Sequence, residues 1–92
     1  MTIASAYVRP TMLDDCITSV LRERRSARLA QLLTPHIGAA AANFHAQRIT
    51  DALLTGGGDV VAVTSKMLPL PPDIRRRAAV QVANAWHAMS YS

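Results

Sequence analysis

The sequence predicts a mainly α-helical domain, a small bundle of three to four helices, and three observations lead to this. The chain has 92 residues, of which 50% are hydrophobic and 17% are charged, which is typical of a globular domain. Aromatic residues make up only 4%, so the core has to be built from Leu, Ile, Val and Ala, which favours closely packed helices. Apolar residues recur at spacings of three and four along most of the chain. This length fits a single domain, residues 1–92, with one modest core.

The first segment, residues 1–10, is permissive for β-structure and ends at Pro10, which predicts an arm or an edge strand. A lone strand needs a partner, and the β-branched residues at 59–65 favour a strand that could pair with residues 2–8. The competing interpretation of residues 59–65 is a short helix capped by Asp59. If residues 59–65 form a strand, a minor two-stranded element with residues 2–8 is expected beside the bundle.

The first helix is expected to begin after Thr11, which suits the N-cap position, with Asp14 and Asp15 in the first turn. Two apolar groups follow, and their centres lie roughly 150° apart around a helix that turns 100° per residue. We therefore expect a bend near residues 24–26, the alternative being a straight helix packed between two partners. The first group consists of Met12, Leu13, Cys16, Ile17 and Val20, and the second of Leu29, Leu32 and Leu33.

The clearest helix of the sequence is expected between Thr34 and Gly56. Thr34 suits the N-cap, Pro35 suits the first helical position, and Gly56 suits the position just past the end. The expected apolar face of this helix consists of Ile37, Ala41, Phe44, Ile49, Ala52 and Leu53.

Residues 56–71 form a connector bounded by glycines and prolines. Pro69, Pro71 and Pro72 favour an extended stretch, after which a last helix is expected from about Pro72 to Met89. The expected apolar face of that helix consists of Ile74, Ala78, Val82, Ala85, Trp86 and Met89.

The sequence contains no motif that indicates catalysis, a cofactor or a metal site. The three histidines, His36, His45 and His87, have no metal-ligand spacing. The single cysteine, Cys16, falls among apolar residues, which is typical of a buried thiol rather than of a nucleophile. The three glycines before Asp59 lack the spacing of a phosphate-binding loop. We therefore expect a protein that is not an enzyme and that binds neither cofactor nor metal.

The basic residues predict an anionic partner, because the net charge is +4 and the pI is about 10.2. Nine of the ten are arginine, which forms paired hydrogen bonds with carboxylates and phosphates. Arg76 and Arg77 share a polar face of the last helix, whereas Arg75 falls at the margin of the apolar face. A second cluster surrounds the expected bend, where the end of a helix already favours positive charge. The expected partner-binding residues are Arg76, Arg77, Asn84, His87, Arg24, Arg25 and Arg28.

His45 and Arg48 lie on or beside the apolar face of the clearest helix. One interpretation is structural: His45 is hydrogen-bonded in the core, and Arg48 extends outward or pairs with Asp51. The other is that this face is an interface with another chain or a second copy, since arginine is enriched at interfaces.

The single cysteine, the absence of a signal-peptide pattern and the lack of a membrane-length apolar run predict a cytoplasmic protein without a membrane partner. We expect a small non-catalytic binding or regulatory protein that docks an Arg-bearing helical surface onto a larger protein or assembly. An accessory or inhibitor protein of a mobile element would fit this size, and the sequence is compatible with a monomer as well as with a homo-oligomer. The alternative is a nucleic-acid-binding regulator whose same arginines contact phosphates. A protein partner is favoured because helix-turn-helix spacing and aromatic stacking residues are missing.

Overall fold

The computed structural model describes residues 10–90, with side chains from residue 19 onward, and this part of the chain folds into four helices. The helices are α2 (Pro10–Ile37), α3 (Ala39–Thr55), α4 (Val60–Met67) and α5 (Pro72–Ser90). The predicted mainly α-helical bundle is thus confirmed. No described helix is both long and apolar enough to cross a membrane. The expected strand at residues 2–8 lies outside the described residues.

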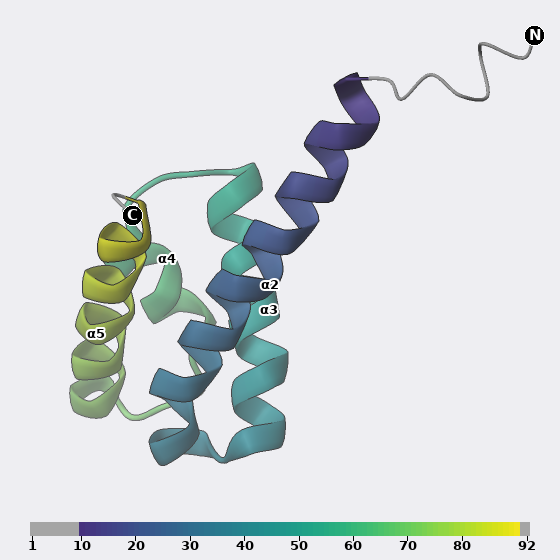
Figure 1. Cartoon of the computed structure of the whole chain (residues 1–92). Coiled ribbons are helices and arrows are strands. Elements are labelled where there is room, and N and C mark those ends of the chain that lie inside the picture. The colour runs from purple at the N-terminus through teal and green to yellow at the C-terminus, as the bar shows by residue number, and fades with distance from the viewer. Residues whose placement is uncertain (1–9, 91–92) are drawn as a thin grey trace, which may run out of the picture.

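The bundle consists of two helical hairpins packed against each other (Figure 1). α2 and α3 run antiparallel side by side, while α4 and α5 form the second pair. α5 packs on α2, and α4 packs on α3, so all four helices contribute to one core. This closes the bundle around the side chains that the two hairpins direct toward each other.

A single residue, Gly38, separates α2 from α3. Its φ of 86° and ψ of 161° fall in a region that is open only to glycine, so the chain reverses here within one residue. The prediction that a helix starts at Thr34 and Pro35 is wrong. Both residues belong to the last turn of α2, where the Thr34 hydroxyl donates to the carbonyl of Ala30 at 2.6 Å. Pro35 lacks a backbone N–H and removes one helical hydrogen bond, which α2 tolerates near its end.

α2 is one uninterrupted helix, so the chain does not break near residues 24–26. Leu29 and Leu33 are fully buried, whereas Val20 is 49% exposed. The N-terminal part of α2 extends beyond the other helices in Figure 1, and α2 begins at Pro10 rather than after Thr11. Val20, the last member of the first apolar group, therefore lies away from the core to which Leu29 and Leu33 contribute.

Residues 59–65 do not form a strand, because α4 covers residues 60–67. The carboxylate of Asp59 accepts a hydrogen bond from the backbone N–H of Ala62 at 2.9 Å, which confirms the competing interpretation of a short capped helix. Val60 and Thr64, four residues apart, are both buried, and this helical spacing overrides the β-propensity of the segment. The connector at residues 56–71 therefore carries a helix of its own.

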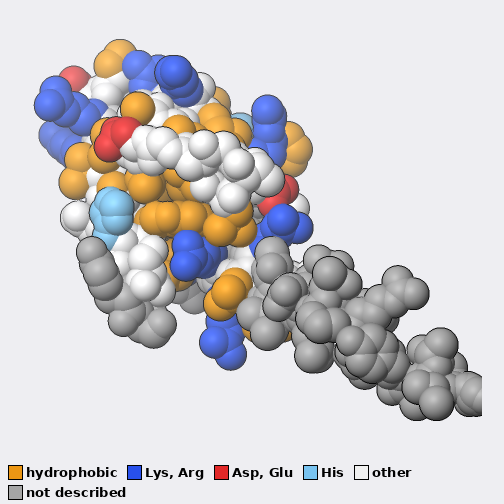
Figure 2. Space-filling model, turned by 90° about the horizontal axis from the view of Figure 1, so that it is seen from above, with side chains coloured by type: hydrophobic (Ala, Val, Ile, Leu, Met, Phe, Trp, Pro, Cys, Tyr) orange, Lys and Arg blue, Asp and Glu red, His pale blue; other side chains and the backbone are white. Residues whose placement is uncertain are grey.

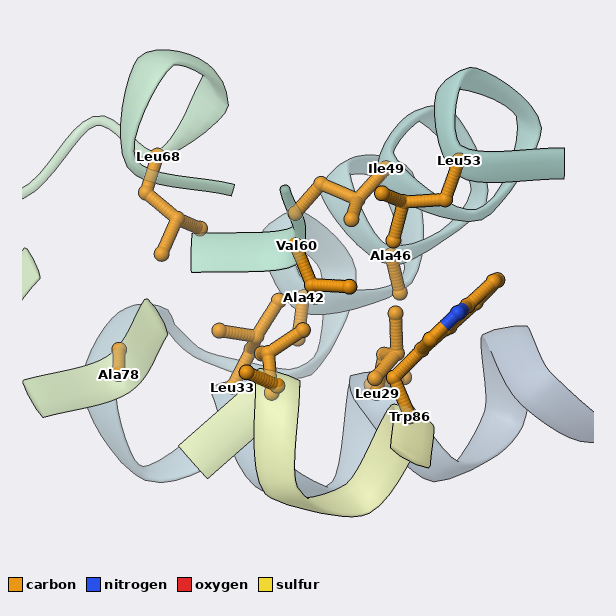
Figure 3. Packing of buried hydrophobic residues seen from close by; sticks show 13 residues of the cluster. Leu29, Leu33, Ala42, Ala46, Ile49, Leu53, Val60, Leu68, Ala78 and Trp86 are labelled. Atoms are coloured by element: carbon orange, nitrogen blue, oxygen red, sulfur yellow. The ribbon is translucent and has the colours of Figure 1, made fainter. Parts of the chain in front are cut away.

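The core is small and built mainly from aliphatic side chains and alanine. Figure 3 shows Leu29 and Leu33 of α2 facing Ile49 of α3 and Trp86 of α5. Trp86 is 8% exposed and is the one aromatic side chain in the core of the described part. Alanines at the helix contacts allow the backbones to approach closely. The buried alanines are Ala30, Ala42, Ala46, Ala78, Ala79 and Ala83.

The apolar face of α3 is rotated by roughly 90° from the expected one. Phe44, expected in the core, is 56% exposed, while the small residues Ala42 and Ala46 are fully buried. The expected face of α3 was wrong at this position because Phe44 was placed in the core for its large apolar side chain. Gly56 does follow directly after the end of α3, as expected.

The last helix forms as predicted, from Pro72 to Ser90. Ala78, Val82 and Trp86 are buried, which confirms the centre of its apolar face. Ile74 is instead 38% exposed, because the first turn of α5 lies at the edge of the bundle.

Candidate functional site

The four residues expected to bind a partner on α5 are all exposed. Arg77 and Asn84 are seven residues apart, and Arg76 and His87 are eleven apart, so each pair returns to nearly the same side of the helix. We call these residues, together with Val80, the α5 face. The structure therefore brings this part of the predicted site together on one surface.

A shallow open groove of about 530 Å³ runs along the first half of the α5 face. At the centre of the face Val80 is 43% exposed, so an apolar side chain is surrounded by polar and basic ones. Gln81 marks the border toward α2, since its Oε1 lies 3.4 Å from Nε2 of His36. The groove is lined by Asp73, Arg76, Arg77, Val80 and Gln81.

The two arginines of the α5 face have no partner within the described part of the chain. Arg76 and Arg77 form neither an ion pair nor a hydrogen bond with the described residues. They also sit in the first turns of α5, where the helix dipole adds positive potential. Arg75 is half-buried, in agreement with its expected place at the margin of the apolar face. An anionic group at this end of α5 would meet two free guanidinium groups.

The second predicted cluster does not act as one patch. Arg24 and Arg28 are exposed, and Arg28 donates to the side chain of Gln31 at 3.3 Å. Arg25 is half-buried, with its guanidinium carbon 4.6 Å from the centre of the Trp86 ring. Arg25 thus packs against Trp86, and its role in binding a partner stays a prediction. On the face seen in Figure 2, Lys and Arg side chains lie at separate places rather than in a single patch.

His45 and Arg48 both surround the exposed ring of Phe44. The His45 ring meets it edge-on, with the ring centres 5.1 Å apart, and the guanidinium carbon of Arg48 lies 5.5 Å from its centre. His45 is half-buried but forms no hydrogen bond with the described residues, and Asp51 pairs with Arg22 instead of Arg48. Arg48 is exposed, as the structural interpretation expected, whereas the hydrogen bond of His45 and the pair of Arg48 with Asp51 do not form among the described residues. The structure instead shows an exposed Phe44 ring with the guanidinium group of Arg48 over it.

A polar groove of about 280 Å³ lies between α2 and α3 and was missed by sequence reasoning. The Nε of Arg22 lies 2.9 Å from Oδ1 of Asp51 across it, as an ion pair rather than a well-aligned hydrogen bond. The Ser26 side chain is buried, and its hydroxyl has no hydrogen-bond partner among the described residues. The groove is lined by Arg22, Glu23, Ser26, Ala27, Asn43, Gln47 and Asp51.

One sequence signal could have revealed this groove. Arg22 and Asp51 lie sixteen residues before and thirteen residues after Gly38. In an antiparallel hairpin that turns at Gly38, residues at similar distances from the turn face each other. Recognising Gly38 as the turn would therefore have paired these opposite charges.

The described residues offer hydrogen bonding and charge but no assembled metal site. No three His, Cys, Asp or Glu side chains gather closely enough to hold a metal ion in this part of the chain. The α5 face suits recognition of carboxylates or phosphates, and the groove between α2 and α3 suits polar groups of either sign.

Comparison with known proteins adds no functional information. Neither protein-family models, nor curated proteins, nor solved structures give a match to this chain.

Proposed function

We propose that this chain is a small non-catalytic binding protein that docks its α5 face onto an acidic surface of a larger protein or assembly. The observation that carries the proposal is the pair of exposed, unpaired guanidinium groups of Arg76 and Arg77 beside a groove. Unpaired arginine on a folded surface is a ready partner for carboxylates. Docking of this kind would regulate the partner by covering part of its surface.

The composition of the α5 face favours a protein partner. Interfaces between proteins carry an apolar centre and a polar rim, and arginine is enriched in them. Here Val80 supplies the apolar centre, while the arginines, Asn84 and His87 supply the rim. A duplex nucleic acid would instead favour a continuous basic stripe, and the basic side chains on the face seen in Figure 2 are dispersed.

The test compares two doubly substituted variants. Arg76→Glu with Arg77→Glu reverses the charge of the α5 face, and Arg24→Glu with Arg28→Glu reverses two equally exposed arginines on α2. Glutamate in the first turns of α5 suits the helix dipole, so the first variant should stay folded by circular dichroism. The chain is used to capture a partner from a lysate of its host, and the identified partner is then purified for affinity measurement.

We expect the α5 variant to bind the purified partner at least about tenfold more weakly, and the α2 variant to bind it like the wild type. Equal affinity of the wild type and the folded α5 variant would reject the α5 face as the docking surface.

The alternative function, nucleic-acid binding through the same arginines, is tested with random duplex DNA. Two phosphate contacts predict that the logarithm of the affinity falls with a slope of about −1.8 against the logarithm of the salt concentration. Fluorescence anisotropy at low salt measures this, and no binding there rejects the alternative.

A further inference from the structure

The polar groove between α2 and α3 contains hydrogen-bonding groups that the fold does not use. Glu23, Asn43 and Gln47 line it, and none of the three forms a hydrogen bond or an ion pair with the described residues. Ser26 is only 9% exposed, and its hydroxyl has no partner in this part of the chain either. Buried hydroxyl groups are normally hydrogen-bonded, and serine can redirect its hydroxyl by rotating between staggered rotamers. The groove therefore has unused donors and acceptors for a ligand.

The size and the lining of this groove limit its ligand to a small polar molecule. The volume of about 280 Å³ is near the lower end of small-molecule sites, which begin at about 300 Å³. Ser26 and Ala27 have short side chains, which leaves room between the two helices. Ala27 is also the one apolar residue of the lining, so an apolar ligand would find little to pack against.

The charged groups of the lining have both signs. The ion pair of Arg22 with Asp51 is made through Nε, and the terminal amino groups of Arg22 form no hydrogen bond with the described residues. The neighbouring Glu23 is exposed, and its carboxylate is unpaired in the same part of the chain. An anionic ligand alone would meet Glu23, and a cationic ligand alone would meet Arg22. A molecule that carries both charges close together suits the groove better than either.

We propose that this groove binds a free α-amino acid with a polar side chain. Its α-carboxylate bonds to the terminal amino groups of Arg22, and its α-ammonium group bonds to the carboxylate of Glu23. Asn43 and Gln47 are four residues apart on α3, and each carboxamide offers both a donor and an acceptor to the side chain of the ligand. The site lies on α2 and α3, so it does not depend on the function proposed for the α5 face.

The first test measures binding of amino acids to the full chain by isothermal titration calorimetry. The probes are glutamine, asparagine and serine, with leucine as the apolar comparison. N-acetylglutamine lacks the ammonium group, and glutamine α-amide lacks the carboxylate. We expect at least one of the three polar amino acids to bind, and leucine to bind at least about tenfold more weakly. If glutamine binds, each blocked form of it should lose at least about tenfold in affinity as well.

Two results of this titration would overturn the proposal. The absence of binding by all three polar amino acids at millimolar concentrations means that the groove does not take this class of ligand. Equal binding of glutamine and both of its blocked forms means that the two charges of the ligand are not recognised.

The second test locates the site with variants whose folding is checked by circular dichroism. Glu23→Gln removes the carboxylate that meets the ammonium group, and Ala27→Leu fills the groove from an exposed position. Each should weaken binding of the polar amino acid at least about tenfold. Asp73→Asn is the control, because it neutralises an exposed carboxylate on α5, outside this groove, and should bind like the wild type. Unchanged binding by both folded groove variants would overturn the proposal, since the amino acid would then bind elsewhere.

Discussion

Arg25 lies with its guanidinium carbon 4.6 Å from the centre of the Trp86 ring, which joins the middle of α2 to the end of α5. The two residues are 61 positions apart in the sequence. A guanidinium over an indole face is attractive because the ring face carries negative potential. This contact therefore joins the two hairpins beside Trp86, the one aromatic side chain in the core of the described part of the chain.

Replacing Arg25 with alanine should destabilise the fold by about 1–2 kcal/mol, because the contact with Trp86 and the packing of the long side chain are both lost. Arg24→Ala is the control, since Arg24 is exposed and contacts no aromatic ring. Guanidinium denaturation followed by the fluorescence of the single tryptophan measures both. Equal midpoints for the two variants would show that the contact contributes nothing to stability.

Thr50→Val should stabilise the protein by about 1 kcal/mol. Thr50 is fully buried and its hydroxyl has no hydrogen-bond partner in the described part of the chain, so the wild type carries the cost of a desolvated polar group. Valine keeps the shape of the side chain and removes that group. Thr34→Val is the control, because the hydroxyl of Thr34 is bonded to the carbonyl of Ala30. Thermal unfolding should raise the midpoint of the first variant only, and an unchanged or lower midpoint contradicts this account.

Gly38→Ala should cost about 1–3 kcal/mol, because an L side chain is strained at a φ of 86° with a ψ of 161°. The cost comes from the backbone alone, since a Cβ at this position would meet no atom within 4 Å. Gly56→Ala is the comparison: a Cβ there would lie 3.2 Å from the carbonyl oxygen of Ala52, a tight contact, but Gly56 has a φ of −97°, which alanine adopts readily, so a smaller loss is expected. Urea denaturation of both variants decides, and a Gly38→Ala variant as stable as the wild type would exclude this strain.

Phe44→Ala should change the free energy of unfolding by less than about 1 kcal/mol, whereas Ile49→Ala should lower it by about 3 kcal/mol. Phe44 is 56% exposed and Ile49 is fully buried, although both belong to α3. The same denaturation experiment ranks the two. A larger loss for Phe44 than for Ile49 would place the aromatic ring in the core after all.

The features predicted well from the sequence depend on local signals. The start of α5 follows from the prolines before it, and the outward position of Arg76 and Arg77 follows from helical periodicity. The end of α3 was marked by Gly56 in the same way. Each of these signals acts within a few residues, so no knowledge of the tertiary structure is needed.

The features that were missed depend on contacts between distant segments. The contact of Arg25 with Trp86 and the pairing of Arg22 with Asp51 arise only once the helices are placed side by side. Phe44 was placed in the core for its size, yet close packing of α3 on its neighbours selects the small side chains instead. The contact of Arg25 with Trp86 was missed because the charge of Arg25 can be read from the sequence, whereas Trp86 lies 61 positions away in the chain.

The glycines between α3 and α4 have a consequence for motion. Gly57 and Gly58 both have positive φ, and the segment that holds them links the two hairpins. The α2–α3 pair is the most closely packed part of the domain, so its amides should exchange with solvent more slowly than those of α4 and α5, which follow the glycines. The α5 face therefore lies on the part of the domain that we expect to open first.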